Sequence, residues 1–266
     1  MKDFLRDITI EAGHISLDYR SRLSTLRVDK KSEKDLVTEA DTAVESFLFE
    51  QIRKRFPEHS LLGEETGEHQ GNEYRWIIDP IDGTTSFLHG QPFYSISIAL
   101  EQAGRVVLGG VNAPVLDELF LAERGQGATR NGVAIAVSQR ARLIDSVLGT
   151  GFACIRADHE HNNLPYFSQV VGKIRGIRRY GSCAIDLSYV ACGLLEGFWE
   201  LNLKIYDMAA GGLILEEAGG KLSDFTGTNA RMPGELVATN GFIHDDMVTL
   251  LTEARTELVA AGIAQP

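Results

Sequence analysis

The feature that most constrains the fold is residues 76–90, WIIDPIDGTTSFLHG, where an apolar run stops at an aspartate followed by a proline. Trp76, Ile77 and Ile78 have the pattern of a buried strand. Pro80 has no amide hydrogen to donate to a sheet ladder, and it disfavours helical geometry at the residue before it. We therefore expect the strand to end at Asp79 and to leave that carboxylate at the end of a sheet.

The turn that follows combines groups suited to a cation with groups suited to a phosphate. Ile81 offers a carbonyl oxygen and Asp82 a second carboxylate, and hard divalent cations such as Mg²⁺ prefer oxygen ligands of this kind. Gly83 allows the backbone to approach a ligand closely, and Thr84 and Thr85 can begin a helix whose free amides attract phosphate. Alternatively, the two aspartates simply cap a strand-to-helix turn, with Thr85 as the helix N-cap.

Other acids occupy similar positions elsewhere in the chain. Glu64 follows an apolar pair and a glycine in LLGEE, and Asp207 begins a helix of small residues in LKIYDMAAGG. Asp41 lies in the first turn of another expected helix. Each has an ordinary explanation as a cap or a solvated charge, but their recurrence in one chain favours a shared site.

Composition limits the classes of protein to which the chain can belong. A chain of 266 residues is expected to form one large unit or two closely joined ones, without needing disulfides. The net charge of −11 opposes direct nucleic-acid binding and suits an anionic substrate that is held through metal cations. Three scattered cysteines indicate a reducing compartment and buried thiols. No apolar run is long enough for a signal peptide or a membrane span, so we expect a cytoplasmic protein without membrane association.

The periodicity of apolar residues indicates two halves. Residues 4–26 and 38–56 have helical spacing, and Thr38 with Asp41 forms a capping-box pattern at the start of the second helix. Strand patterns follow from about residue 75, with Asn131-Gly132 as a hairpin turn. Strands and helices then alternate. We expect an N-terminal α+β half with the metal loop at residues 1–140, and a C-terminal α/β half that closes the active site at residues 141–266.

Four segments, DLVTEAD, GEE, DPIDGTTSF and YDMAAGGLILEEAGG, resemble the motifs of the inositol monophosphatase family of magnesium-dependent, lithium-sensitive phosphatases. They occur in the family's order through nearly the whole chain. The resemblance implies a layered α/β fold, the five-layered αβαβα sandwich of the sugar-phosphatase type, and a homodimer. It also implies Mg²⁺ as the cofactor.

The resemblance implies specific roles for individual residues. The first metal position matches Glu64, Asp79 and the Ile81 carbonyl, and the second matches Asp79, Asp82 and Asp207. A third, weaker ion would depend on Glu64 and waters. These carboxylates carry four negative charges, too many to cluster without cations, and their pKa values should rise when the metals are removed.

The remaining matches concern catalysis and the substrate. Asp41 and Thr84 correspond to the pair that orients the attacking water, and Glu64 shares this catalytic role. The positions that match substrate contacts are Gly83, Thr84, Gly181, Ser182, Cys183, Glu200 and Asp207. Lys30 lies where the family has a basic residue near the metals, and is a further possible contact.

The function implied is hydrolysis of a small polyol phosphate, with inositol monophosphate favoured, by a metal-activated water. Tyr206 stands where the family usually has tryptophan and is similar to relatives that dephosphorylate histidinol phosphate; Ser86 replaces a frequent asparagine. Histidinol phosphatase, or another small sugar or nucleotide phosphatase, is therefore an alternative, although Thr85 argues against the bisphosphate-nucleotidase branch. Some bacterial relatives bind transcription machinery, so a regulatory protein with weak phosphatase activity is a further alternative.

Three other features have ordinary interpretations. The H-x-H spacing of His159 and His161 in DHEH lacks further metal ligands nearby in sequence, so we expect a solvated loop. His89 is expected to serve in a turn, and Trp199 to lie in the core.

Overall fold

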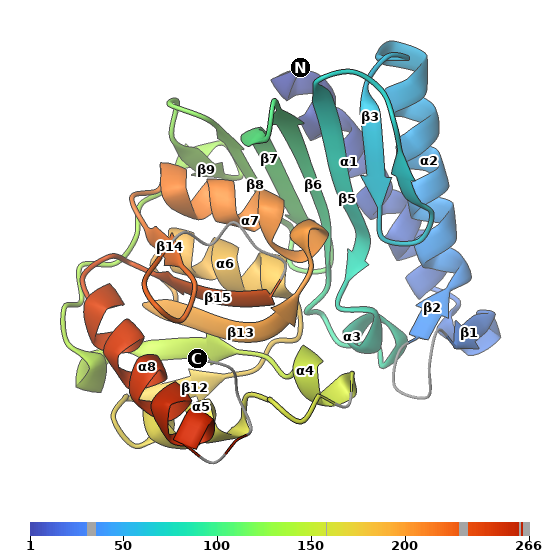
Figure 1. The fold of residues 1–266 in the computed structure, drawn as a ribbon. Helices are drawn as coiled ribbons and strands as arrows, with labels where there is room; N and C mark the ends of the chain where they lie inside the picture. Colours follow the sequence, from blue (N-terminus) through green and yellow to red (C-terminus); the bar gives the residue numbers. More distant parts are fainter. Residues whose placement is uncertain (31–35, 158, 229–233, 261, 263–266) are drawn as a thin grey trace.

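The computed structural model describes residues 1–30, 36–157, 159–228, 234–260 and 262. The elements form five layers, in the order helices, sheet, helices, sheet, helices (Figure 1). The predicted αβαβα sandwich is therefore confirmed. Among the described residues, no helix is long and apolar enough to span a bilayer.

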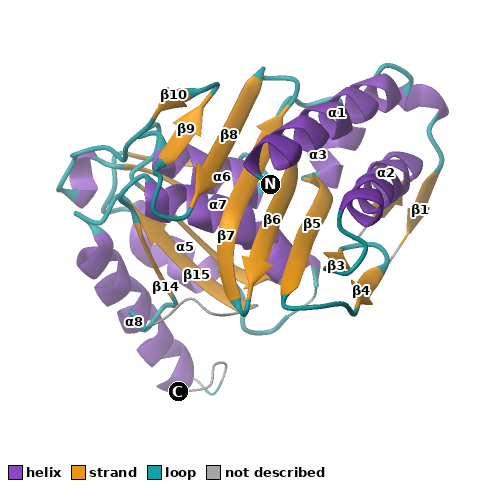
Figure 2. Cartoon of the chain, turned by 90° about the horizontal axis from the view of Figure 1, so that it is seen from above, coloured by secondary structure: helices purple, strands orange, loops and turns teal. Residues whose placement is uncertain are grey.

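The first layer consists of helices α1 (Lys2–Arg20) and α2 (Glu39–Arg55), which lie side by side on one face of a sheet (Figure 2). The predicted capping box is present, because Thr38 accepts the Asp41 amide and Asp41 accepts the Thr38 amide. The first helix ends at Arg20, earlier than its apolar spacing predicts. The short elements after it are η1 (Leu23–Thr25), β1 (Val28–Lys30) and β2 (Leu36–Thr38).

The second layer is an eight-stranded sheet with the order β10-β9-β8-β7-β6-β5-β3-β4. Its pairs are antiparallel except β3 with β5. Trp76 and Ile78 pack against the first layer, and Ile77 packs against the middle helices, as strand alternation requires. The strands are β3 (Ser60–Gly63), β4 (Gly67–His69), β5 (Tyr74–Asp82), β6 (Ser95–Gln102), β7 (Arg105–Ala113), β8 (Glu118–Glu123), β9 (Ala128–Arg130) and β10 (Val133–Ala134).

Strand β5 does not end at Asp79, so that prediction is wrong. It continues through Pro80 to Asp82, and its register against β6 shifts from Asp79↔Ser97 to Asp82↔Ser95. The shift places one extra residue on β5, which is a β-bulge, and a bulge tolerates a proline that cannot donate to the ladder. The bulge therefore keeps both aspartates at the same end of the strand.

The predicted hairpin at Asn131-Gly132 is confirmed. Both residues have positive φ, 51° and 79°, and they join β9 to β10 in a two-residue turn.

The middle layer contains α6 (Cys183–Ala191) and α7 (Ile205–Glu217), which lie between the two sheets. Small residues let them pack closely: a Cβ added at Gly211 would lie 2.8 Å from the Leu187 Cβ. This close packing brings the first turns of both helices to the end of β5.

The second sheet has the order β12-β11-β13-β15-β14, and α5 (Leu164–Val171) and α8 (His244–Ala260) cover its outer face. Trp199 is fully buried there and donates its indole hydrogen to Asn163, so its predicted core position is confirmed. The strands and the small elements beside them are η2 (Leu143–Asp145), β11 (Val147–Thr150), α4 (Ala153–Arg156), β12 (Gly176–Arg178), β13 (Gly197–Leu203), β14 (Lys221–Ser223) and β15 (Gly234–Thr239).

Candidate active site

Parallel pairing of β3 with β5 brings Glu64 beside Asp79. The register pairs Gly63 with Ile78, and the Glu64 amide donates to the Ile78 carbonyl at 3.2 Å. Glu64, which follows β3, and Asp79, which follows Ile78 within β5, therefore lie at the same end of the sheet. Two acids fifteen residues apart in sequence meet for this reason.

Asp79, Asp82 and Asp207 form a tight cluster. Each offers a carboxylate oxygen, and these oxygens all lie within 4.8 Å of one another. Asp207 reaches the cluster from the first turn of α7, where it accepts the Lys204 amide at 2.5 Å. The cluster joins the end of the first sheet to the middle helices.

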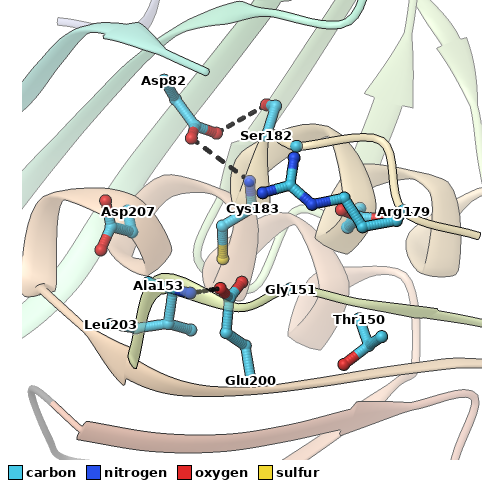
Figure 3. A pocket seen from close by; sticks show the side chains of 12 residues that line it. Asp82, Thr150, Gly151, Ala153, Arg179, Ser182, Cys183, Glu200, Leu203 and Asp207 are labelled. Carbon is cyan, nitrogen blue, oxygen red and sulfur yellow. Dashed lines mark hydrogen bonds between the residues drawn. The ribbon is translucent and has the colours of Figure 1, made fainter. Parts of the chain in front are cut away.

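The N-terminus of α6 fixes the Asp82 carboxylate (Figure 3). The Ser182 hydroxyl donates to it at 2.6 Å, and the amides of Ala184 and Cys183 donate at 2.7 and 3.3 Å. Ser182 is fully buried and also accepts the Ile185 amide as the helix N-cap. The Gly-Ser-Cys loop therefore positions a candidate metal ligand, a role that the sequence did not indicate.

Burial and crowding raise the pKa values of the clustered carboxyls. Burial raises the pKa of Asp79 well above its usual value, and Glu64, Asp82 and Asp207 raise it further. The pKa of Asp82 rises to about 6 because burial outweighs its three hydrogen-bond donors. Asp207 is partly exposed, but burial of its carboxyl and the nearby Asp82 also raise its pKa well above the usual value. Like charges are thus held together without enough donors to stabilise them.

This arrangement fits divalent cations. The donors are all oxygens, the ligand set that Mg²⁺ prefers, and the cluster carries more negative charge than the neighbouring hydrogen bonds offset. Glu64, Asp79, Asp82, Asp207 and the Ile81 carbonyl are the groups that could hold the ions.

Thr84 and Asp41 form the predicted pair. The Thr84 hydroxyl lies 3.3 Å from Asp41 Oδ1 and 3.2 Å from the Ile81 carbonyl. Thr38 donates its amide to the other oxygen of Asp41 at 2.9 Å, and burial raises the pKa of this carboxyl to about 6. Helix α2 therefore presents Asp41 to the turn that follows β5.

Gly83 explains how that turn reverses so tightly. Its φ of 99° lies in the left-handed region, and an added Cβ would lie 3.0 Å from the Phe93 carbonyl and 3.1 Å from the Gly181 carbonyl. Gly83 is the N-cap of α3 (Thr84–Leu88), so the suggestion that Thr85 caps this helix is wrong.

A cavity opens beside the aspartate cluster, between the two sheets. Glu200 projects into it from β13 and accepts the Ala153 amide at 2.9 Å (Figure 3). Six lining residues were not predicted from the sequence, and two of them are charged, Arg179 and Asp186. An acid inside the apolar run CAIDLSYVA was the available signal for Asp186. The lining comprises Asp82, Thr150, Gly151, Ala153, Arg179, Gly181, Ser182, Cys183, Asp186, Glu200, Leu203 and Asp207.

Asp186 differs from the other acids of this region. It is 2% exposed, and no described residue donates a hydrogen bond to its buried Oδ1. Burial and the nearby Glu200 raise its pKa well above the usual value. A buried carboxyl group with a raised pKa therefore lines the cavity.

Other residues considered from sequence lie apart from this cavity. His161 shares a hydrogen bond of 2.7 Å with the Tyr166 hydroxyl, and His89 is exposed at the end of α3. Tyr206 precedes Asp207 in α7 and packs against the core between the sheets. Lys30 ends β1, but its side chain lies outside the described residues, as do Asp158 of DHEH and residues 31–35 of the basic connector.

The three cysteines are free thiols, as expected. Cys154 and Cys183 are buried, whereas Cys192 is only half-buried. Cys183 lies on the cavity wall, so it is not purely a core residue.

Comparison with known proteins matches the model of the inositol monophosphatase family to residues 1–260. The chain is 43% identical over 236 residues to Nus factor SuhB of Pseudomonas aeruginosa, covering 86% of this chain and 87% of that protein. It is 41% identical over 238 residues to inositol-1-monophosphatase of Mesorhizobium japonicum, covering 88% and 89%. The solved structure of extragenic suppressor protein suhB from Bartonella henselae superposes with a TM-score of 0.90 at 39% identity, covering 94% of this chain and 98% of that one.

Proposed function

The chain belongs to the inositol monophosphatase family, and on this premise we propose that it is a magnesium-dependent phosphatase that hydrolyses inositol monophosphate to inositol and phosphate. A relative 41% identical is named inositol-1-monophosphatase, which supports this substrate. A cytoplasmic location is part of the proposal and agrees with the three free cysteines.

One observation carries the proposal: three carboxylates meet within 4.8 Å beside a cavity that contains Glu200 and the Gly181–Cys183 loop. The carboxylates suit divalent cations, which in turn suit a phosphate dianion. The cavity lies next to them, and its polar lining suits the hydroxyl groups of the substrate's alcohol part. An anion site and a polyol site thus share one cleft.

Residues of the chain supply the steps of hydrolysis. When bound, the divalent cations would offset the carboxylate charge and stabilise the negative charge that develops on the transferring phosphoryl group. Thr84 donates its hydrogen to Asp41, so a lone pair of its oxygen can accept a hydrogen from the attacking water. Glu64 accepts the proton that this water loses. The water oxygen bonds to phosphorus, the bond to the alcohol oxygen breaks, and that oxygen takes up a proton.

The substrate is oriented from both sides of the cleft. The backbone amides of Gly83 and Thr84 face the phosphate in this proposal, and Asp207 and Glu200 accept hydrogen bonds from substrate hydroxyls. Gly181, Ser182 and Cys183 form the wall beside the ring. Ser182 acts here through its backbone, because its hydroxyl is bound to Asp82.

A phosphate-release assay tests the proposal. The panel contains inositol monophosphate, histidinol phosphate, fructose bisphosphate and adenosine bisphosphate, each with magnesium and with a chelator. We expect the highest kcat/KM for inositol monophosphate and no release after chelation. A higher kcat/KM for histidinol phosphate would select that alternative, which Tyr206 favours. If no phosphate were released from any of these substrates, the proposal that the chain is a phosphatase would be rejected.

A second candidate function rests on the name Nus factor SuhB, carried by a relative 43% identical. It is that of a regulatory protein that binds transcription machinery and keeps weak phosphatase activity. Immobilised protein incubated with purified RNA polymerase tests it. Retention by the wild-type protein and by an Asp207→Asn variant alike would establish a role separate from catalysis.

We also propose a homodimer, as the family implies. Light scattering on the eluted protein should give twice the chain mass of 29.2 kDa. A monomer mass at micromolar concentration would contradict the proposal.

A further inference from the structure

Glu45 is a buried acid in the middle of α2 that the proposed mechanism does not use. It is 1% exposed, and both of its carboxylate oxygens accept backbone amides. Oε2 accepts the amide of Glu65 at 3.0 Å, and Oε1 accepts the amide of Thr66 at 2.9 Å. These amides belong to the turn between β3 and β4, directly after Glu64. Glu45 therefore binds the backbone that carries a candidate metal ligand.

The contact is close enough to require a glycine beside it. If Gly63 carried a Cβ, its three nearest neighbours would be the carboxylate atoms of Glu45, at 2.4, 2.5 and 2.8 Å. Gly63 has no positive φ among the described backbone angles, so its conformation does not call for glycine. Glycine is required at this position because a side chain would not fit: the Glu45 carboxylate packs directly on the strand backbone.

Helix α2 thus holds both sides of the candidate metal site. Asp41 and Glu45 are four residues apart and share one face of the helix. Asp41 contacts Thr84 in the turn after β5, and Glu45 holds the turn after β3. In Figure 1, α2 runs beside β3 and β5 at the edge of the sheet.

We propose that Glu45 is a positioning residue that fixes the turn after β3, so that Glu64 is held toward the metal site before any ion binds. This inference rests on the proposed function. Glu64 lies near enough to Asp79, Asp82 and Asp207 for its charge to act on all three. A ligand on a fixed turn loses little conformational freedom when an ion binds, whereas a ligand on a loose turn must be ordered at the expense of affinity.

The expected signature is a loss of magnesium affinity with little loss of maximal rate. Partners that orient metal ligands typically contribute 10- to 100-fold in metal affinity or activity. For Glu45→Ala we expect titration calorimetry to give magnesium binding roughly tenfold weaker than in the wild type. We expect kcat at saturating magnesium to stay within about threefold. Glu45→Gln keeps one acceptor oxygen, so its magnesium affinity should lie between those of the wild type and Glu45→Ala.

Glu50→Gln is the matched control, because Glu50 lies on the same helix and is exposed. Its magnesium affinity should equal that of the wild type. Equal magnesium affinity in wild type and Glu45→Ala, with a lowered melting temperature, would reduce Glu45 to a structural residue and overturn the proposal.

Gly63 supplies an independent test that does not depend on one variant folding well. Gly63→Ala should displace Glu45 and weaken magnesium binding in the same way. In a Glu45→Ala background the added methyl group no longer meets the carboxylate, so the double variant should bind magnesium as well as Glu45→Ala alone. If the two substitutions lowered magnesium affinity additively in the double variant, the contact between Gly63 and Glu45 would not be the cause of the weaker binding.

The inference and the proposed function fail in different ways. If the wild-type protein takes up no magnesium in the calorimeter and releases no phosphate, the proposed function fails. If the wild type does both and the Glu45 and Gly63 variants match it in magnesium affinity, only the role of Glu45 fails.

Discussion

The metal side and the substrate side of the cleft use the same residue types but balance charge differently. On the metal side, carboxylate oxygens of Asp79, Asp82 and Asp207 lie within 4.8 Å of one another, and the charges of Asp82 and Asp207 raise the pKa of Asp79. On the substrate side, no described residue donates a hydrogen bond to the buried Oδ1 of Asp186, and Glu200 accepts a backbone amide. In the proposed function, divalent cations would balance the charge of the first cluster, whereas Glu200 would accept a substrate hydroxyl. Changes on the metal side should therefore affect every substrate, and changes on the substrate side should affect particular substrates or stability.

The largest effect is expected for Asp207→Asn. Removing one charge from the shared cluster should lower phosphate release at least about 10³-fold for every phosphate ester tested, because the cations that stabilise the transition state lose a ligand. Initial rates at saturating magnesium measure this loss. Asp79→Asn should behave in the same way.

The fold should survive this substitution, because an asparagine oxygen can still accept the Lys204 amide. Circular dichroism and the melting temperature check that point. Asp246→Asn, on the exposed side of α8, is the control and should keep its rate. A residual rate above one tenth of the wild type at saturating magnesium would place Asp207 outside the metal set.

The next effect is on stability without metal. The pKa of Asp82 is about 6 in the fold against 3.8 ordinarily, so the folded state keeps a proton that the unfolded state has lost. Stability should therefore fall as pH rises from about 4 to 6, by on the order of 3 kcal/mol for this group, and Asp41 should act in the same direction. Urea unfolding in a chelator, at half-unit pH steps, measures the slope.

Magnesium should remove most of that slope, because bound cations favour the ionised carboxylates. The same unfolding series with saturating magnesium is the control. Identical slopes with and without magnesium would mean that these carboxylates do not respond to the ion, and the contrast between the two sides would disappear.

The two sides also differed in how far the sequence could predict them. The candidate ligands of the metal side lie in short motifs next to strand or helix ends, so Asp79, Asp82, Glu64 and Asp207 could be proposed from the sequence. The five layers followed in outline from the same resemblance. The bulge at Pro80 was missed, because sequence alone does not show whether pairing resumes after a proline.

The substrate side depends on contacts between distant segments, and these leave little trace in the sequence. Ser182 was expected to contact substrate, yet its hydroxyl is bound to Asp82, one hundred positions earlier. Asp186, from α6, and Arg179, from the loop between β12 and α6, were missed because only the tertiary fold brings them to the cavity. Glu45 was missed for the same reason.

A moderate effect confined to one class of substrate is expected for Glu200→Gln. A charged acceptor contributes roughly 1 kcal/mol more to a hydrogen bond than a neutral one, which corresponds to about a fivefold rise in KM for inositol monophosphate. The kcat should stay within about threefold, because the metal side is intact. Methyl phosphate, which has no ring hydroxyls, is the control substrate and should show no change. If kcat/KM fell equally for both substrates, Glu200 would act on the metal side and not on the substrate hydroxyls.

The smallest effect is expected for Asp186→Asn, and it concerns stability. Burial raises the pKa of Asp186 in the fold, so its contribution to stability falls as pH rises above the ordinary carboxyl pKa. The asparagine variant keeps the shape but does not titrate, so it should be more stable than the wild type at pH 7 and no more stable at pH 4. Urea unfolding of both proteins in saturating magnesium isolates the contribution of Asp186 to the free energy of unfolding, because we expect the ions to remove the pH dependence of the metal side. A gain that is the same at both pH values would mean that Asp186 is ionised in the fold, and the substrate side would then balance its charge as the metal side does.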